Sequence, residues 1–300
     1  MIPILITAWK RPEKVQKLIN IVREYKPSKL YISCDGPRLD IDGQKEKVAE
    51  TRLILENSIN WDCEVYKNYY EFNRGCKDGM SNAIDWFFSM EEEGIILEDD
   101  CLPHPDFFYY CEELLAKYRY DERIFSISGC NLQNGIKRGD GSYYFSRYSH
   151  VWGWASWRRS WQFYDKNLSQ WDKIKSQNNF DSFFVNNVEK NFWVRIFDNL
   201  KYHGIPDTWD FQWSFTHFLY DKLTIIPNEN LINNIGFDYE ATHTLSSPPN
   251  TKINKSLLPL KHPKFIIRDK NADEYFFRNH YKLSFLKKIL KIFRNLLMKF

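Results

Sequence analysis

The chain has 300 residues, of which 43% are hydrophobic and 17% aromatic, enough for the core of one large domain or two modest ones. Its net charge of +3 is uneven, because residues 282–300 carry six basic residues and no acid, while the rest carries 36 basic and 39 acidic residues. This balance argues against a nucleic-acid partner. No window reaches the ~18 apolar residues of a membrane span.

The six cysteines are scattered without a C-x-x-C pair, which argues against a zinc site and a disulfide scaffold. The opening M-I-P-I-L-I-T-A-W-K-R-P lacks the long apolar core of a signal peptide. We therefore expect a cytoplasmic protein.

Short apolar strands alternate with amphipathic helices over the first 130 residues. The periodicity predicts strands at 2–7, 30–33, 63–66, 95–97 and 124–128, and helices at 11–25, 44–57, 77–90 and 106–120. This order predicts an α/β fold with a mostly parallel sheet flanked by helices.

The pattern changes after residue 140. A short strand is expected at 143–145, helical structure over 166–200, and a further helix ending near residue 220. We expect a domain over residues 1–245, with halves at 1–130 and 131–245, then an irregular linker over 246–280 and a helix over 281–300.

Polar segments follow three of the predicted strands. These are T-A-W at 7–9, C-D-G-P at 34–37 and E-D-D at 98–100. Ligands of such sheets bind outside the carboxyl ends of the strands, so the three segments should form one site.

The triplet Glu98, Asp99 and Asp100 directly follows an apolar strand. Neighbouring like charges raise one another's pKa, so a positive group or a positioned proton should offset their repulsion. Mg²⁺ and Mn²⁺ take carboxylate and phosphate oxygens, which makes a metal site one interpretation and a solvated acidic loop the other. The chain has no P-loop motif, which argues against a P-loop ATPase. No G-x-G-x-x-G follows the first strand, which argues against a dinucleotide-binding dehydrogenase.

The stretch I-I-L-E-D-D-C-L-P-H-P-D-F-F resembles the metal motif of nucleotide-sugar-dependent glycosyltransferases with the GT-A (Rossmann-like) fold. The nearest form is that of the N-acetylglucosaminyltransferase I family and its bacterial relatives. I-L-I-T-A-W-K-R-P, the C-D-G turn, N-R-G-C-K-D-G-M-S-N-A-I-D-W-F-F and H-V-W-G-W-A-S-W resemble further elements of that fold. The resemblance spans roughly residues 2–244.

The resemblance implies that Asp100 coordinates the Mn²⁺ or Mg²⁺ that bridges the diphosphate of a nucleotide-sugar donor. Glu98 and Asp99 would contact the ribose or the donor sugar. Residues 1–130 would form the nucleotide-sugar-binding half and residues 131–245 the acceptor half.

Other donor contacts follow from the same resemblance. Thr7, Ala8 and Arg11 would lie where the first strand ends beside the nucleotide base, and Asp35 would contact a uracil. Lys77, or alternatively Arg74, would contact phosphate.

Asp210 lies between aromatic residues in W-D-F-Q-W, a setting that raises the pKa of a carboxyl and suits a general base. The alternative is a helix N-cap, for which Asp207 in P-D-T is the better candidate. The family carries its base in a similar motif at a helix start, which favours Asp210, with Asp207 second. Direct displacement by the acceptor hydroxyl would invert the anomeric centre.

Two further residues are candidates for ligand contacts. His243 could bind diphosphate or metal, or be structural. The tryptophans at 152, 154, 157 and 161 are mostly expected in the core, but one or two of their rings could stack on a sugar. Trp154 is the first candidate, because it follows Gly153, which permits close backbone approach.

We therefore expect a metal-dependent, inverting glycosyltransferase. The alternatives are a non-catalytic carbohydrate-binding protein, which would not explain E-D-D, and a nucleotide-sugar pyrophosphorylase. The latter needs a glycine-rich basic loop after the first strand, and T-A-W-K-R-P has no glycine.

Residues 285–300 place their apolar side chains on one side of a helix and their basic side chains on the other. This pattern is typical of a helix lying on an anionic membrane, and the alternative is a helix docked on the protein's own core. We expect peripheral attachment to the inner face of the cell membrane and a glycan or lipid-linked acceptor.

Removal of residues 282–300 should abolish binding to anionic liposomes and leave turnover in solution intact, because the basic apolar segment would supply the membrane contact. Liposome sedimentation of the full and truncated chains measures this. Undiminished binding of the truncated chain would assign the segment to the core instead.

Overall fold

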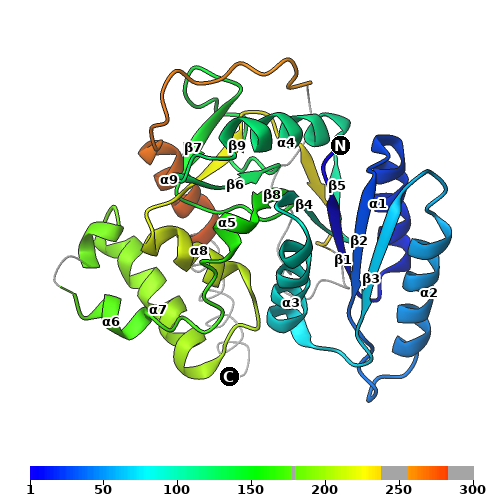
Figure 1. The fold of residues 1–300 in the computed structure, drawn as a ribbon. Coiled ribbons are helices and arrows are strands. Elements are labelled where there is room, and N and C mark those ends of the chain that lie inside the picture. The colour runs from blue at the N-terminus through cyan, green and yellow to red at the C-terminus, as the bar shows by residue number, and fades with distance from the viewer. Residues whose placement is uncertain (178–179, 238–255, 283–300) are drawn as a thin grey trace, which may run out of the picture.

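The structure is a computed structural model that describes residues 1–177, 180–237 and 256–282 (Figure 1). The strands are β1 (Ile4–Ala8), β2 (Lys29–Cys34), β3 (Glu64–Tyr69), β4 (Glu93–Glu98), β5 (Cys101–Pro103), β6 (Ile124–Ser128), β7 (Tyr143–Ser146), β8 (Trp154–Trp157), β9 (Leu223–Pro227) and β10 (Ile232–Asn234). The helices are α1 (Pro12–Tyr25), α2 (Gln44–Asn57), α3 (Gly75–Met90), α4 (Pro105–Tyr118), α5 (Arg158–Trp161), α6 (Trp171–Lys175), η1 (Phe180–Phe183), α7 (Asn187–His203), α8 (Asp210–Leu219), α9 (Lys270–Phe276) and η2 (Phe277–Lys282).

An eight-stranded sheet in the order β3-β2-β1-β4-β8-β6-β9-β7 forms the centre of the molecule, and β10 pairs with β5 beside it. Within the described residues, four of the seven pairings in the large sheet are parallel, namely β1–β2, β1–β4, β2–β3 and β6–β9. The predicted α/β fold, with a large, mostly parallel sheet flanked by helices, is confirmed.

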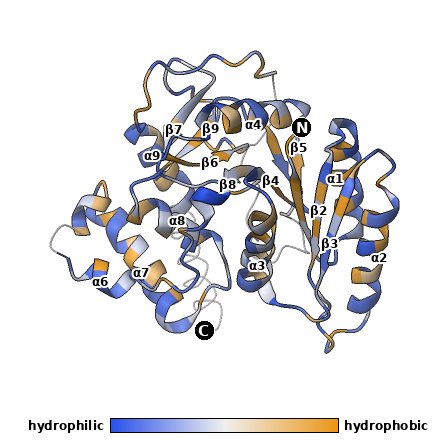
Figure 2. Cartoon of the chain, in the orientation of Figure 1, coloured by the Kyte–Doolittle hydropathy of each residue, from blue (hydrophilic) through white to orange (hydrophobic). Residues whose placement is uncertain are grey.

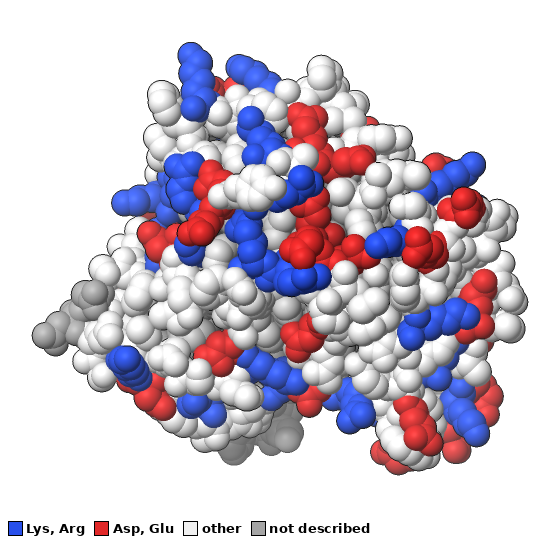
Figure 3. All heavy atoms as spheres, viewed as in Figure 1, with Lys and Arg blue, Asp and Glu red and all other residues white. Residues whose placement is uncertain are grey.

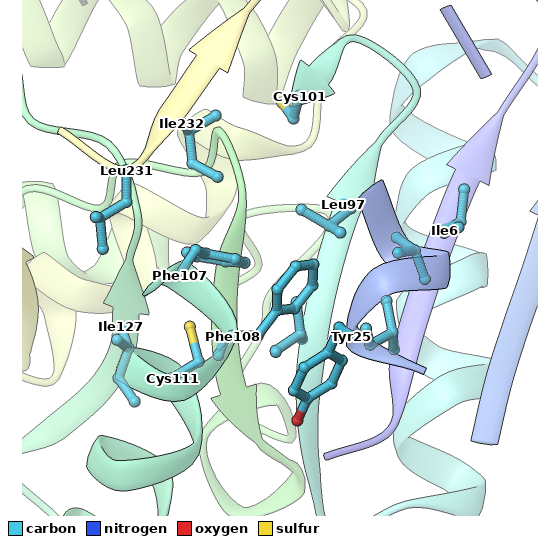
Figure 4. Packing of buried hydrophobic residues seen from close by; sticks show 14 of the residues in the cluster. Ile6, Tyr25, Leu97, Cys101, Phe107, Phe108, Cys111, Ile127, Leu231 and Ile232 are labelled. Carbon is cyan, nitrogen blue, oxygen red and sulfur yellow. The ribbon is translucent and has the colours of Figure 1, made fainter. Parts of the chain in front are cut away.

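Alternation along the strands divides the core between the two faces of the sheet. Ile4 and Ile6 of β1 belong to the cluster that packs against α1, α2 and α4, whereas Leu5 belongs to the cluster that packs against α3 and α8. Figure 4 shows part of the first cluster, where Phe107 and Phe108 of α4 lie near Leu97 of β4. Figure 2 shows how the apolar residues concentrate on the strands.

Local signals explain where α1 begins and ends and where α4 begins. Pro12 starts α1, where its missing N–H costs nothing, and Lys26 ends it in the left-handed conformation. The Nδ1 atom of His104 accepts a hydrogen bond from the backbone N–H of Asp106 and so caps α4.

All nine elements expected in the first 130 residues are present. The helix at 44–57 and the strand at 124–128 have the predicted bounds, and the others differ by up to three residues, as where β3 continues to Tyr69. The strand predicted at 143–145 is β7.

The sequence reading missed strand β8, in the tryptophan-rich stretch. β8 lies antiparallel between β4 and β6, where Ala155 faces both Ile95 and Ile127. This strand joins β3-β2-β1-β4 to β6-β9-β7 in one sheet, and no local pattern in the sequence reveals its partners.

Two predicted segments differ from the structure. The helical stretch expected over 166–200 is divided into α6, η1 and α7. In the predicted linker, residues 270–276 form α9, because Ala272 and Phe276 find apolar partners and Asp269 caps the helix. The expectation of an irregular linker therefore does not hold there.

Residues 238–255 and 283–300, which include His243 and nearly all of the predicted C-terminal helix, lie outside the described residues. Within the described part of the chain, no helix combines the length and the apolarity needed to cross a membrane. On the face shown in Figure 3, basic and acidic side chains are intermixed.

Candidate functional site

A pocket of about 250 Å³ opens where β1, β2, β3 and β4 end, far larger than the ~30 Å³ share of one water molecule. Its wall includes residues that follow all four strands, together with residues 207–210 ahead of and within α8 and residues near the end of β10. The three polar segments predicted to converge do line this one pocket. The wall includes Thr7, Ala8, Arg11, Asp35, Glu98, Asp99, Asp100 and Asp210.

Arg11 is the positive group that lies among the three acids. Its Nη1 atom is 2.6 Å from Oδ2 of Asp100 and 3.3 Å from Oδ1 of Asp99. The backbone N–H of Trp9 also donates to Oδ2 of Asp99, at 3.3 Å. Because β1 and β4 are parallel neighbours with Thr7 opposite Glu98, the turn after β1 brings Arg11 beside the triplet.

Burial and mutual repulsion raise the pKa values of Glu98 and Asp99. Burial, followed by the charges of Asp100 and Asp99, raises the pKa of Glu98 well above its ordinary value. Burial raises the pKa of Asp99 to about 6, although Arg11 opposes the shift. Burial alone would lower the pKa of Arg11, but the charges of Asp99 and Asp100 raise it overall. The charge of Arg11, aided by Lys14 at Asp99, thus offsets only part of the repulsion among the three acids.

The donor set around Asp100 fits a hard cation that shares its coordination with a ligand. Within residues 1–177, 180–237 and 256–282, no group of three or more Asp, Glu, His or Cys side chains forms a ready metal cage. Mg²⁺ and Mn²⁺ commonly take one or two carboxylates and complete their shell with substrate phosphates and water. Asp100, with a partly accessible carboxylate beside the open pocket, could be such a ligand.

Gly236 is a site residue that the sequence reading missed. A Cβ atom at this position would lie 2.2 Å from Oδ2 of Asp100 and 3.0 Å from Oδ1 of Asn234. The N–H of Ile235 donates to the carbonyl of Asp100 at 2.8 Å, which fixes this close approach. Any side chain at position 236 would displace the Asp100 carboxylate. The need for a glycine therefore follows from this contact in space and not from the neighbouring sequence.

Asp35 organises the pocket end beside β2 and β3. Its carboxylate accepts hydrogen bonds from the N–H groups of Gly36 and Arg74, at 2.8 and 2.9 Å, and from Nδ2 of Asn73, at 2.8 Å. Burial raises the pKa of Asp35, although the backbone hydrogen bonds from Arg74 and Gly36 and the Arg74 charge oppose the shift.

Trp9 and Arg38 lie at the same end of the pocket. The Nε1–H of Trp9 donates to the carbonyl of Gly36 at 2.8 Å, and the Arg38 guanidinium lies 5.2 Å from the centre of the Trp9 ring. This end therefore offers an aromatic ring and polar groups together.

The structure separates the roles of Asp207 and Asp210. Both oxygens of Asp207 accept backbone hydrogen bonds at the start of α3, from Cys76 at 2.8 Å and from Lys77 at 3.1 Å. Asp207 is thus a helix cap, although of α3 and not of the following helix. Asp210 is the first residue of α8, accepts a hydrogen bond from the Thr208 hydroxyl and lines the pocket.

Trp154 is buried, with 1% of its surface exposed, and stacks on Trp209 at a ring separation of 5.5 Å. This burial contradicts the predicted stacking of Trp154 on a sugar. Gly153 has a positive φ of 60°, and a Cβ there would meet Ile232, so this glycine serves chain packing. Trp152 lines the pocket instead, with Phe237 edge-on at 5.5 Å.

The side chains of Lys77 and Arg74 are not among those that line the pocket, so the geometry gives no support for the predicted phosphate contact from either. Of the described basic residues, Arg11 and Arg38 line it. His243 lies outside the described residues.

No protein-family model matches the sequence, and no curated protein matches it either. Three solved structures to which this chain is similar are a UDP-glucose pyrophosphorylase in its apo form, mouse xyloside xylosyltransferase 1 and an active-site mutant of LgtC. The first is 10% identical over 78% of this chain and 92% of that chain, with a TM-score of 0.39.

The mouse xyloside xylosyltransferase 1 structure is 12% identical over 73% and 82% of the two chains, with a TM-score of 0.37. The LgtC structure is 10% identical over 80% and 91%, with a TM-score of 0.36. Similarity at this level is no basis for assigning an activity to this chain.

In the metal-free protein, Asp99→Asn should raise the unfolding temperature at pH 8, and the gain should vanish below about pH 4. The folded state raises the pKa of Asp99, so the stability that this group contributes is fully present below its unfolded pKa of ~3.9 and is lost as the pH rises through about 6. An asparagine avoids that loss. Thermal unfolding at both pH values measures it, with Asp62→Asn on the surface as the control. An equal shift at both pH values would contradict the prediction.

Proposed function

We propose that this chain is a metal-dependent, inverting glycosyltransferase of the GT-A type, which moves a sugar from a nucleoside diphosphate to a hydroxyl of an acceptor. One observation carries the proposal. The acid triplet at the end of β4, Asp35 after β2 and Asp210 at the start of α8 line a single pocket. Groups suited to a nucleotide, a metal–diphosphate and an acceptor proton thereby face the same space.

The donor would lie across the ends of β1, β2 and β4. The nucleotide base, proposed to be uracil, would sit near Asp35 and Trp9, where hydrogen-bonding groups and an aromatic ring occur together. Glu98 and Asp99 would face the ribose or the donor sugar. Thr7 and Ala8 form the strand end beneath them.

Asp100 would hold Mn²⁺ or Mg²⁺, which when bound supplies Lewis-acid neutralisation of the departing diphosphate. Arg11 would remain close to the same charge, because its guanidinium already contacts both Asp99 and Asp100. The protein's own cation therefore shares in stabilising the leaving group.

Asp210 would accept the proton of the acceptor hydroxyl as that oxygen attacks the anomeric carbon. A new bond forms between this oxygen and the anomeric carbon while the bond from that carbon to the diphosphate oxygen breaks. The leaving nucleoside diphosphate takes the bonding electron pair, and attack from the opposite face inverts the centre. Asp207 is unsuited to this role, since backbone N–H groups bind both of its oxygens.

The acceptor would enter beside Trp152 and Phe237, whose rings offer apolar surface for a sugar. A glycan or lipid-linked acceptor fits the basic, apolar composition of residues 282–300, through which the chain would bind the inner face of an anionic membrane.

UDP should bind only with Mn²⁺, and Asp100→Ala should weaken this binding at least ~100-fold, because loss of mere outer-shell partners already costs 10–100-fold. Calorimetric titration with and without metal measures both effects. Asp62→Ala on the surface should bind as the native chain does. If UDP bound without metal, and equally tightly to Asp100→Ala and to Asp62→Ala, Asp100 would not be part of the donor site.

Asp210→Asn should lower the release of UDP from UDP-sugars in the presence of acceptor by roughly 10²–10⁴-fold, because the proton acceptor is lost. Binding of UDP and Mn²⁺ should be unchanged. Asp221→Asn, just beyond the other end of α8, is the matched control. Near-normal turnover of Asp210→Asn would refute the assignment of Asp210 as the base. If the native chain bound UDP and Mn²⁺ but turned over no UDP-sugar, the non-catalytic carbohydrate-binding alternative would be favoured.

A further inference from the structure

Asp207 links two parts of the molecule that are distant in sequence. It lies in the loop between α7 and α8, yet its carboxylate binds the N–H groups of Cys76 and Lys77 in the first turn of α3. Gly75 precedes them with a φ of +80°, and a Cβ there would lie 2.7 Å from Oδ2 of Asp207. Asp207 can thus approach α3 closely because position 75 carries no side chain.

The same short segment is held from its other side by Asp35. The carboxylate of Asp35 binds Asn73 and the N–H of Arg74, and that of Asp207 binds the N–H groups two and three residues further on. Residues 73–77 are therefore fixed between a carboxylate at the end of β2 and a carboxylate that precedes α8.

The backbone between Asp207 and Asp210 has little freedom. The Thr208 hydroxyl donates to Asp210, and the Trp209 ring stacks on buried Trp154. The Tyr164 hydroxyl donates to the carbonyl of Trp209 at 3.2 Å. These contacts make residues 207–210 a short, stiff segment, at most ~10 Å long, so we expect a shift of Asp207 to move Asp210 with it.

We propose that Asp207 is a positioning residue, which by capping α3 fixes Asp210 at the distance from the acid triplet that the transfer requires. The catalytic part rests on the function proposed above, whereas the structural part does not. A displacement of about 1 Å of a reacting group can reduce a rate ~100-fold. Loss of the hydrogen bonds between Asp207 and the start of α3 should therefore affect turnover more than binding.

The test compares full-length Asp207→Ala and Asp207→Asn with the native chain. Asp269→Ala is the matched control, because Asp269 caps α9 through the N–H of Ala272. The first readout is amide hydrogen exchange. Asp207→Ala should speed exchange at the start of α3 and also over residues 208–212, whereas the control should change neither.

The second readout is kinetic, with UDP-sugars as donors. Asp207→Ala should lower kcat ~10–100-fold and change the donor KM less than ~3-fold, and the pH profile should keep its shape because Asp210 is intact. Asp207→Asn should recover part of the loss, since its amide oxygen can still accept one N–H.

Two results would overturn the proposal. Faster exchange confined to the start of α3, with kcat unchanged, would make Asp207 a simple cap. Equal losses in both variants with an altered pH profile would make Asp207 itself the acid–base group. If the native chain turns over no UDP-sugar, the proposed function fails, and exchange over residues 208–212 still decides whether Asp207 holds α8.

Discussion

The pocket depends on the contact of Arg11 with Asp99 and Asp100. Three adjacent carboxylates at a buried strand end are unfavourable on their own, and burial raises the pKa values of Glu98 and Asp99. The parallel pairing of β1 with β4 brings the turn that carries Arg11 beside the triplet. The sheet topology thus provides the counter-charge that lets three acids persist where a ligand can reach them.

The other side of the pocket comes from the second half of the chain. Gly236 lies against the carboxylate of Asp100, and Asp207 binds the first turn of α3. Neither half contains the whole site, because the acids follow β4 and Asp210 begins α8. The function we propose needs this convergence, since the donor and acceptor groups must meet in one space.

The sequence allowed the convergence of the polar turns after the first strands to be predicted. Apolar strands followed by polar turns are local signals, and parallel strands bring their carboxyl ends together, so Asp35 and the triplet could be placed on one edge in advance. Trp154 could not be placed, because its burial depends on the pairing of β8 with β4 and β6. The roles of Gly236 and Asp207 could not be predicted either, because each depends on a contact with a residue more than 100 positions away.

The ribosome delivers the strands of the large sheet in an order that differs from their order in space. β4 ends at Glu98, but its second neighbour, β8, begins only at Trp154, and β6 joins β4 only through β8. At synthesis rates of ~5–20 residues per second, the apolar edge of β4 stays unpaired for roughly 3–11 s. An unpaired edge is a template for pairing with other chains. During this interval, a chaperone that covers the edge of β4 would protect the nascent chain from such pairing.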